Sequence, residues 1–342
     1  MSGNAVAAAI RELAFGTSLT QDAAAEAFDV IMRGDATPVQ VAALLTALRV
    51  KGETSEEVAG AARALRGAML QVPALSPEDL VDTCGTGGGS VTTFNVSTAA
   101  AILAAALGVR VAKHGNRSFT SQSGSADVLE ALGIPLDAPV ERLASILDSC
   151  GIVFMFAPAM HPAMRHVGPV RRELGIPTVM NIVGPLANPA SAGRQVVGVA
   201  DPSRLSLVAG ALAALGSKHA LVVHGQPGMD EVSPLGTTSV AEIHRGTVRH
   251  WTIDPEDFSL GGGAVDELRG GTPTENAALI RDLLAGAGSP AARSAVILNT
   301  AAALFVAERY PSFAACVSEA RTALGSGVGR EMLIRMISAY RG

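Results

Sequence analysis

Aromatic residues are scarce in this chain, and so are cysteines. Phe, Trp and Tyr make up 4% of the 342 residues, against a hydrophobic content of 48% and 37 glycines. This composition disfavours an aromatic-rich β-sandwich and favours helices packed closely on a sheet. The three cysteines, Cys84, Cys150 and Cys316, are far apart and form no CxxC pair. A disulfide framework or a zinc site built on them is therefore not expected, and a reducing compartment fits.

The chain also lacks a strong excess of one charge and a long apolar run. It has 26 Lys and Arg against 31 Asp and Glu, which argues against broad nucleic-acid or membrane binding, while a local basic pocket for phosphates stays compatible. The longest apolar stretch, Ala99–Val109, is too short to cross a bilayer. Arg11 and Glu12 interrupt the N-terminal alanines, so no secretory signal is visible. We expect a soluble, cytoplasmic protein.

The first seventy residues predict helices alone. Thr37-Pro38-Val39-Gln40 is a capping box with proline at the first helical position, and Thr54 with Glu57 repeats the capping signal. Pro73, Ser76 and Pro77 then interrupt the pattern, which predicts a domain boundary.

Beyond this boundary, short β-like runs alternate with alanine-rich helical stretches. This alternation is typical of a mostly parallel α/β sheet flanked by helices. The predicted buried strands are residues 80–82, 109–112, 152–156, 195–199 and 220–223. Residues 238–253 predict an antiparallel hairpin that turns at Arg245-Gly246, and the chain from about Thr274 predicts several helices.

A glycine-rich loop directly follows the first predicted strand. Asp82-Thr83-Cys84-Gly85-Thr86-Gly87-Gly88-Gly89-Ser90 allows the backbone to turn tightly and to place N–H groups against an anion. It has no Gly-Lys-Ser/Thr ending, so it is not a Walker A loop. Ser90 stands where the dinucleotide fingerprint needs glycine, and no acidic residue follows about twenty positions later.

Three further segments carry phosphate- or metal-binding residue types. Asn95-Val96-Ser97-Thr98 precedes a helix, where free N–H groups favour phosphate. Lys113-His114-Gly115-Asn116-Arg117-Ser118 follows a predicted parallel strand, at the end where α/β folds place ligands, and Ser123–Asp127 opens the next helix. Asp230-Glu231 offers hard oxygen ligands of the kind that a phosphate-bound Mg²⁺ takes. Each segment alone also fits an ordinary helix cap or a solvated loop.

Taken together and in this order, these motifs resemble those of the anthranilate phosphoribosyltransferases. Asn181-Ile182-Val183-Gly184-Pro185-Leu186-Ala187-Asn188-Pro189 and the helical opening at Ala47–Thr54 extend the resemblance over nearly the whole chain. The resemblance implies a transferase of tryptophan biosynthesis. Such an enzyme couples anthranilate to phosphoribosyl pyrophosphate (PRPP) with Mg²⁺, giving N-(5-phosphoribosyl)anthranilate and pyrophosphate.

The resemblance also implies an organisation. A small helical domain, residues 1–72, is joined by a returning segment at about 162–188. Residues 73–161 and 189–342 form a larger α/β domain of the nucleoside phosphorylase and phosphoribosyltransferase type, with the site in the cleft between the two. A homodimer through the helical domain is expected.

Site residues are carried over by motif. PRPP binding is expected at Gly85, Gly88, Gly89, Thr93, Asn95, Val96, Ser97, Thr98, Lys113, His114, Gly115, Asn116, Arg117, Ser118, Phe119, Thr120, Ser121 and Ser125. Anthranilate binding is expected at Gly85, His114, Asn116, Arg171 and Gly184, and Mg²⁺ binding at Ser97, Asp230 and Glu231. No general base is assigned, and His114 fits an orienting role as well as a structural one. The sequence departs from many members at Gly89, where they carry Asp, and at Pro177, where they carry Arg.

Two rivals differ in the motifs they require. A pyrimidine nucleoside phosphorylase shares the expected architecture but should show a different Lys- and Ser-rich phosphate pattern. A non-catalytic nucleic-acid-binding relative would call for a strongly basic surface, whereas this chain has a net charge of −5.

Overall fold

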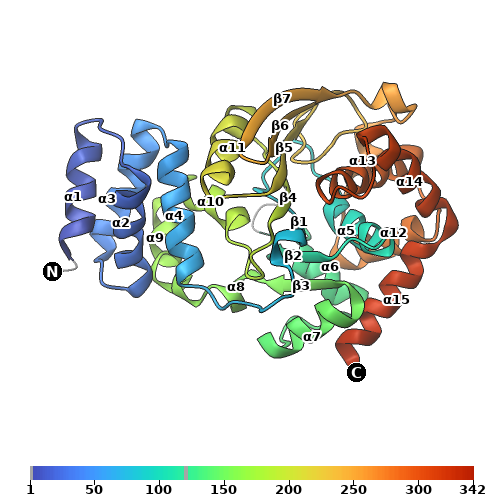
Figure 1. Cartoon of the computed structure of the whole chain (residues 1–342), viewed down its shortest axis with the longest axis horizontal. Helices are drawn as coiled ribbons and strands as arrows, with labels where there is room; N and C mark the ends of the chain where they lie inside the picture. The colour runs from blue at the N-terminus through green and yellow to red at the C-terminus, as the bar shows by residue number, and fades with distance from the viewer. Residues whose placement is uncertain (1–2, 119–121) are drawn as a thin grey trace.

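The computed structural model describes residues 3–118 and 122–342, and its first part is entirely helical. The four opening helices are α1 (Gly3–Ala14), α2 (Gln21–Arg33), α3 (Pro38–Lys51) and α4 (Ser55–Gly67). They lie together at the end of the molecule that holds the N-terminus (Figure 1, blue). Both predicted capping boxes are confirmed: Gln40 accepts from the Thr37 N–H at 2.9 Å, and Glu57 accepts from the Thr54 N–H at 2.8 Å.

A seven-stranded sheet forms the centre of the molecule, in the order β3-β2-β1-β4-β5-β6-β7. The strands are β1 (Val81–Gly85), β2 (Val111–Gly115), β3 (Ile152–Phe156), β4 (Arg194–Gly198), β5 (His219–Gly225), β6 (Thr238–His244) and β7 (Thr247–Ile253). The first five pair in parallel, and β6 and β7 add antiparallel. The mostly parallel sheet is thus confirmed. The predicted hairpin is confirmed as well, because Arg245 and Gly246 turn it with positive φ angles of 50° and 78°.

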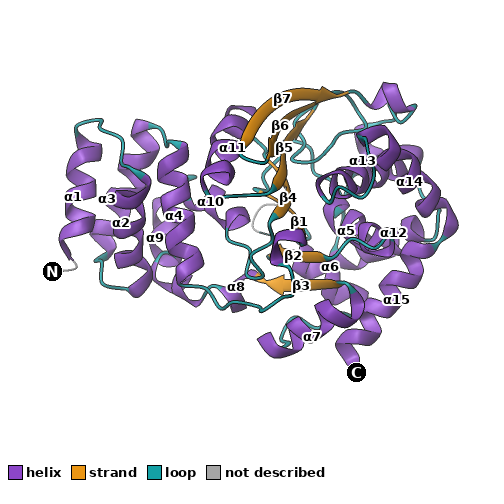
Figure 2. Ribbon diagram, in the orientation of Figure 1, coloured by secondary structure: helices purple, strands orange, loops and turns teal. Residues whose placement is uncertain are grey.

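Helices cover both faces of this sheet (Figure 2). The remaining helices are α5 (Val96–Ala106), α6 (Ser125–Leu132), α7 (Val140–Cys150), α8 (Ala157–Met160), α9 (Gly168–Leu174), α10 (Met180–Val183), α11 (Leu205–Ala214), α12 (Pro273–Leu284), α13 (Pro290–Val306), α14 (Phe313–Ser326) and α15 (Val328–Arg341). Helices α10 and α11 lie between the sheet and the opening helices, whereas α5 and α12–α15 lie on the opposite side (Figure 1).

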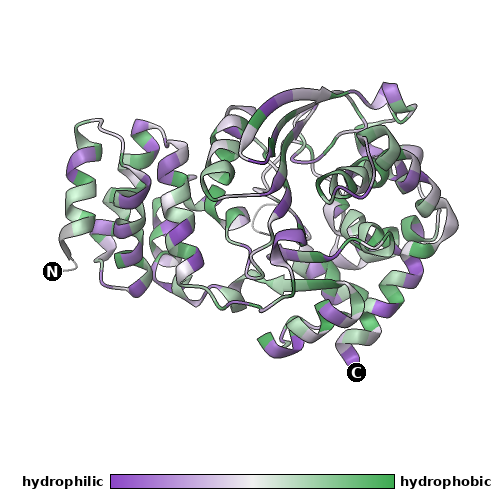
Figure 3. Ribbon diagram, viewed as in Figure 1, coloured by the Kyte–Doolittle hydropathy of each residue, from purple (hydrophilic) through white to green (hydrophobic). Residues whose placement is uncertain are grey.

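Two hydrophobic cores meet at the sheet, because its strands are apolar on both faces. Val197 and Val222 belong to the core shared with the opening helices. Val196 and Val223 belong to the core shared with α5 and the C-terminal helices. Alternate side chains of each strand therefore serve different layers. In Figure 3 the strands carry green and purple segments, and their apolar residues are buried on both faces of the sheet.

The segment at 162–188 packs with the opening helices. Ala163, Val167 and Val179 belong to the same core as Val6 and Leu44. This contact is what the expected returning segment requires, while the domain bounds and the cleft between the domains stay predictions. Within residues 3–118 and 122–342, no helix has the length and apolar character to span a bilayer.

Candidate active site

Four parallel strands end in glycine at the same edge of the sheet. Gly85, Gly115, Gly198 and Gly225 are the last residues of β1, β2, β4 and β5. Without side chains at these positions, the loops that follow can fold back closely over the strand ends. The predicted phosphate- and metal-binding segments lie at or just beyond the ends of β1, β2 and β5, so this edge is the candidate site.

The glycine-rich loop after β1 folds against the loop after β5. Gly87 and Gly88 have φ angles of 68° and 83°, a region that favours glycine. The Gly87 N–H donates to the Asp230 carboxylate at 3.0 Å, and the Ser90 N–H donates to the carbonyl of Gly228 at 3.0 Å. At Gly89, a Cβ would lie 2.9 Å from the Gly228 carbonyl oxygen. The bare backbone at 89 therefore lets these two loops meet.

The segment Asn95–Thr98 forms the start of α5. Asn95 precedes the helix, and its side chain donates to the Ser123 carbonyl at 3.0 Å and accepts from Asn276 at 2.9 Å. The Ser97 hydroxyl lies in the first turn, 3.2 Å from the Lys113 ammonium. Val96 and Thr98 are buried, and the Thr98 hydroxyl has no hydrogen-bond partner among the described residues.

Lys113 is a buried cation at this edge, with 4% of its surface exposed. Its ammonium donates to the carbonyl of Thr83 on β1 and to the Ser97 hydroxyl. Burial lowers its pKa, whereas the nearby carboxylates of Asp82 and Glu231 act to raise it. Lys113 therefore presents a desolvated positive charge between β1 and α5, where an anion would be attracted strongly.

Asp82, the second residue of β1, holds the neighbouring strand β2 in place. Its carboxylate is fully buried, accepts the His114 N–H at 3.1 Å and accepts the Asn188 amide at 2.8 Å. Burial raises the pKa of Asp82 to about 6, against the opposing effect of Lys113. Asn188 also donates to the carbonyl of Ala112 on β2 at 2.8 Å. One amide thus joins β1 and β2.

His114 and His161 form a buried imidazole pair. Their Nε2 atoms are 3.2 Å apart, so one ring donates and the other accepts. Burial lowers the pKa of His114 to about 3 and that of His161 to about 4. Both rings are therefore neutral at pH 7. His161 stands just before the segment at 162–188 and links it to β2.

Asp230 and Glu231 lie over the ends of β1 and β4. The Thr93 hydroxyl donates to the Glu231 carboxylate at 3.1 Å, and the Ser97 N–H also bonds to it. Burial, together with Asp230, raises the pKa of Glu231 to about 8, and burial raises the pKa of Asp230. A small cavity beside them is lined by Ser97 and both acidic residues. Burial thus disfavours the ionised forms of both carboxyl groups.

Two predicted residues of the loop after β2, Asn116 and Arg117, bond to residues of α6. The Arg117 guanidinium pairs with Asp127 at 2.7 Å and with Glu130 at 2.5 Å, which raises its pKa. The Ser125 hydroxyl donates to the Asn116 carbonyl at 3.3 Å, and a Cβ at Gly115 would collide with that hydroxyl. The predicted residues Phe119, Thr120 and Ser121 lie outside the described residues.

Arg171 and Gly184 lie in the segment at 162–188. Arg171, in α9, is half-buried, and its guanidinium is 3.4 Å from the Asn181 side-chain oxygen. A Cβ at Gly184 would meet nothing within 4 Å. The next residue, Pro185, accepts a hydrogen bond from Gln195 on β4 at 2.9 Å. Among described residues, no hydrogen bond joins Arg171 to the glycine loop, Lys113 or the acidic pair.

The structure adds supporting residues that sequence reasoning missed. Asn299 on α13 bonds both backbone groups of Val232, at 3.0 and 2.8 Å, and so fixes the residue after the acidic pair. Asn276 on α12 holds Asn95. A polar residue inside the apolar run of α13 was the available signal for Asn299, because a buried amide needs partners. For His161 and Thr83, the sequence contained no comparable indication of a supporting role.

Comparisons with known proteins agree with this arrangement. Residues 77–330 match the family model described as glycosyl transferase family, a/b domain, and residues 7–69 match its helical bundle domain. The anthranilate phosphoribosyltransferase of Roseiflexus sp. (strain RS-1) is 48% identical over 97% of both chains, and that of Rubrobacter xylanophilus is equally similar over 97% of both.

Solved structures give the same result. The crystal structure of anthranilate phosphoribosyltransferase from Thermus thermophilus superposes with a TM-score of 0.92 at 43% identity, covering 98% of this chain and 99% of that one. The Saccharomyces cerevisiae enzyme in complex with PRPP and Mg superposes with a TM-score of 0.88 at 28% identity, covering 98% of each.

Proposed function

The chain belongs to the anthranilate phosphoribosyltransferase family, and from this premise we propose that it transfers the phosphoribosyl group of PRPP to the amine of anthranilate. The products are N-(5-phosphoribosyl)anthranilate and pyrophosphate, and the reaction serves tryptophan biosynthesis. The observation that carries the proposal is the meeting of Lys113, Ser97 and the acidic pair at one edge of the sheet. A cytoplasmic location stays a prediction.

The leaving group sets the main chemical demand. Breaking the bond between C1 of the ribose and pyrophosphate builds negative charge on the pyrophosphate and positive charge on the ring. Fixed donors that face the developing negative charge lower the barrier, and they act most strongly where water is excluded. Lys113, the first turn of α5 and the backbone of the glycine loop supply such donors in our proposal. Their neighbours hold them in place: the Lys113 ammonium bonds to Thr83 and Ser97.

Mg²⁺ is the cofactor we propose, held by Asp230, Glu231 and Ser97. The donor set fits, because carboxylate and hydroxyl oxygens are the ligands that Mg²⁺ takes. The raised pKa values of both carboxyl groups also fit, since a nearby divalent cation would favour their ionised forms. When bound, the ion would neutralise charge on the pyrophosphate.

For the anthranilate amine, correct placement matters more than a general base. An aromatic amine is nucleophilic once its proton can leave, and alignment of two bound reactants alone contributes roughly 7–11 kcal/mol. We therefore assign no general base. His114 is neutral and bonded to His161, which supports a positioning role for it. Arg171 is proposed to hold the anthranilate carboxylate, because a guanidinium grips a carboxylate in a bidentate fork.

A homodimer through the helical part is also proposed. Phe15, Val39 and Val50 belong to the opening helices or the turn after α1, and they are exposed by 88%, 78% and 82%. Large apolar side chains so exposed are typical of contact surfaces between subunits.

The test is a direct assay. Purified protein is mixed with anthranilate, PRPP and Mg²⁺, and the loss of anthranilate fluorescence is followed. We expect decay that requires all three components and that stops when Mg²⁺ is chelated. Lys113→Met should slow it strongly, whereas Lys218→Met, at an exposed position just before the opposite end of β5, should not. No decay with intact PRPP would refute the proposed function.

A further inference from the structure

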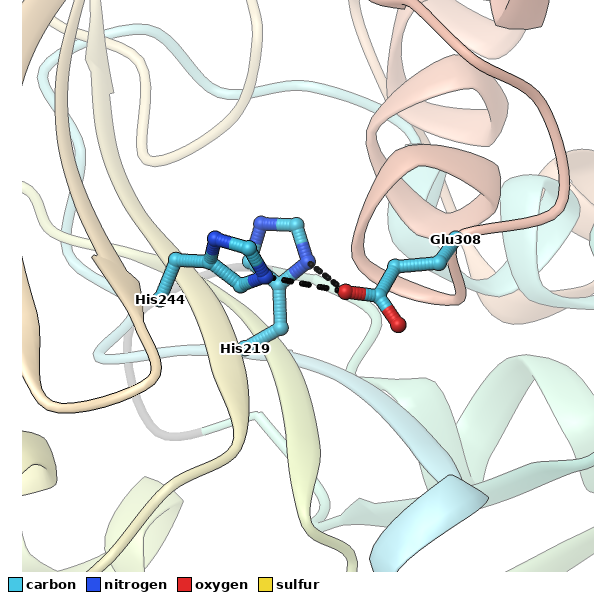
Figure 4. A group of neighbouring side chains, drawn as sticks. All are labelled: His219, His244 and Glu308. Atoms are coloured by element: carbon cyan, nitrogen blue, oxygen red, sulfur yellow. Dashed lines mark hydrogen bonds and ion pairs between the residues drawn. The ribbon is translucent and has the colours of Figure 1, made fainter.

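A second group of potential metal ligands lies at the other edge of the sheet. His219 is the first residue of β5 and His244 is the last of β6, and the two are directly paired across these antiparallel strands. Glu308 comes just after α13 and turns its carboxylate toward both rings (Figure 4). The acidic pair follows the opposite end of β5, so the two groups are separated by the length of that strand.

The ligand atoms have a spacing suited to one ion. His244 Nε2 is 2.9 Å and His219 Nδ1 is 3.9 Å from the same oxygen, Oε1 of Glu308. All three atoms lie within 4.8 Å of one another. Bonds of about 2.0–2.1 Å to tetrahedral Zn²⁺ place neighbouring ligand atoms about 3.4 Å apart. The two measured separations bracket this value, so small side-chain rotations suffice.

The hydrogen bond of the His219 ring leaves Nδ1, the nitrogen that faces Glu308, free to bind an ion. Its Nε2 is 3.0 Å from the Glu242 carboxylate. Glu242 also accepts hydrogen bonds from the Arg249 guanidinium and from the Trp251 indole N–H, each at 2.8 Å. Glu242 is therefore an acceptor, and Nε2 carries the hydrogen. Nδ1 then has its lone pair available.

That lone pair is buried without a hydrogen-bond partner among the described residues. The His219 side chain is 4% exposed, and its Nδ1 faces the Glu308 carboxylate. The buried nitrogen and the carboxylate oxygen are both electron-rich, so a cation bound between them would satisfy the nitrogen that lacks a partner. A carboxylate that bonds the far nitrogen of a histidine is also the usual support of a histidine ligand to zinc.

Solvent reaches two of the three potential ligands, and two arginines neutralise part of the charge of the nearby carboxylates. His244 and Glu308 are 39% and 37% exposed, so solvent reaches the site. Arg194 bonds the other oxygen of Glu308 at 2.9 Å, which leaves Oε1 for an ion. Arg249 bonds the other oxygen of Glu242 at 2.8 Å. Each carboxylate thus has one oxygen fixed by a guanidinium and one directed at a histidine.

We propose that His219, His244 and Glu308 bind one divalent transition-metal ion, of which Zn²⁺ is the best fit. Two imidazole nitrogens and one carboxylate suit zinc and neighbouring metals rather than Mg²⁺. With three protein ligands, water completes the coordination. The ion joins β5, β6 and the end of α13, so its role is to stabilise this edge of the sheet.

The test uses the full-length protein after chelator treatment, with Zn²⁺ alone as the probe. Competition with a chromogenic chelator gives affinity and stoichiometry. The Asp230→Asn, Glu231→Gln double variant serves as background, so that the acidic pair does not contribute. We expect one ion per chain, with a Kd below about 10 µM. Replacement by Co²⁺ should give the intense visible absorption of a four-coordinate site.

Matched variants then identify the ligands. His244→Asn and Glu308→Gln should each weaken binding by more than about 100-fold, because loss of an outer-shell partner alone costs about 10–100-fold. His250→Asn, an exposed histidine on β7, should leave binding unchanged. Circular dichroism checks folding, and the two ligand variants test the site independently of each other. Absence of a bound ion, or binding that survives both ligand variants, would overturn the proposal and leave an ion-pair network without metal.

Discussion

Replacing Asn188 by Ala should destabilise the α/β part of the molecule severely. The amide is 2% exposed and makes three buried hydrogen bonds, to Asp82 at 2.8 Å, to the Ala112 carbonyl at 2.8 Å and from the Ala190 N–H at 2.9 Å. In the alanine variant, each of these partners loses a hydrogen bond in a place that water reaches poorly. Each such loss costs about 1–3 kcal/mol, so we expect a total of at least about 3 kcal/mol.

The single tryptophan provides the assay. Trp251 packs against the larger core through Phe305 and Phe313, so its fluorescence reports unfolding of the α/β part. Urea unfolding at pH 7 should shift to a clearly lower midpoint for Asn188→Ala. Gln71→Ala, which removes an exposed amide, should stay near the parent. A loss below about 1 kcal/mol would refute the reasoning, because it would mean that these buried groups need no amide.

A second substitution, of Asn188 by a charged residue, tests the same contact with Asp82. Asn188→Asp would place a second carboxylate about 2.8 Å from that of Asp82 in a buried position. Like charges at this distance cannot both ionise, so the pair should share one proton. We expect this variant to be less stable than the alanine variant at pH 8 and to recover part of the difference at pH 5. Equal stability at both values would contradict the placement of Asp82.

Other outcomes test the remaining parts of the site and fold. Arg171→Ala should raise the KM for anthranilate at least about tenfold more than that for PRPP, as expected for a lost carboxylate partner; equal changes would reject the role. Asp230→Asn with Glu231→Gln should lower turnover at limiting Mg²⁺ by about 100-fold or more, and near-normal rates would remove the pair from the site. Asp82 has a pKa of about 6 in the folded protein and about 4 in the unfolded chain, so the folded protein keeps its proton to higher pH. The free energy of unfolding should therefore fall as the pH rises from about 4 to about 6. The fall is about 3 kcal/mol, and urea unfolding should show that Asp82→Asn lacks it. Val39→Asp should shift the sedimentation coefficient from dimer to monomer, and an unchanged value would place the contact elsewhere.

Local sequence patterns were sufficient to predict most of the fold. The five parallel strands and the hairpin at 238–253 follow from short apolar runs and turn residues, and the helix starts at 38 and 55 follow from capping boxes. The strand ends were less predictable. β1 and β2 continue to Gly85 and Gly115, because pairing with β4 and β3 holds these glycines in the ladder. Such pairing depends on tertiary contacts that no local pattern reports.

The candidate site was predictable as a set of segments but not as a set of contacts. Lys113 stood out because it follows a predicted parallel strand, Ser97 because it lies at a helix start, and Asp230 because a second carboxylate adjoins it. The pairing of Arg117 with Asp127 and Glu130 was not visible, because it depends on how the loop after β2 meets α6. The histidine group at the opposite edge was equally hidden. Its two rings meet through the register of β5 and β6, which a long connection separates in the sequence.

Glycine at two strand ends explains where the acidic pair lies. A Cβ at Gly198 would overlap the carbonyl oxygen of Asp230, and one at Gly85 would lie 2.9 Å from the Asp230 carboxylate. Any side chain at these positions would therefore push the loop after β5 away from the sheet. An acidic dipeptide on such a displaced loop would be ordinary solvated surface. With glycine at both ends, the loop folds over β1 and β4, and burial there raises the pKa of Glu231. Two residues without side chains thus bring the carboxylates close to Ser97 and the glycine loop.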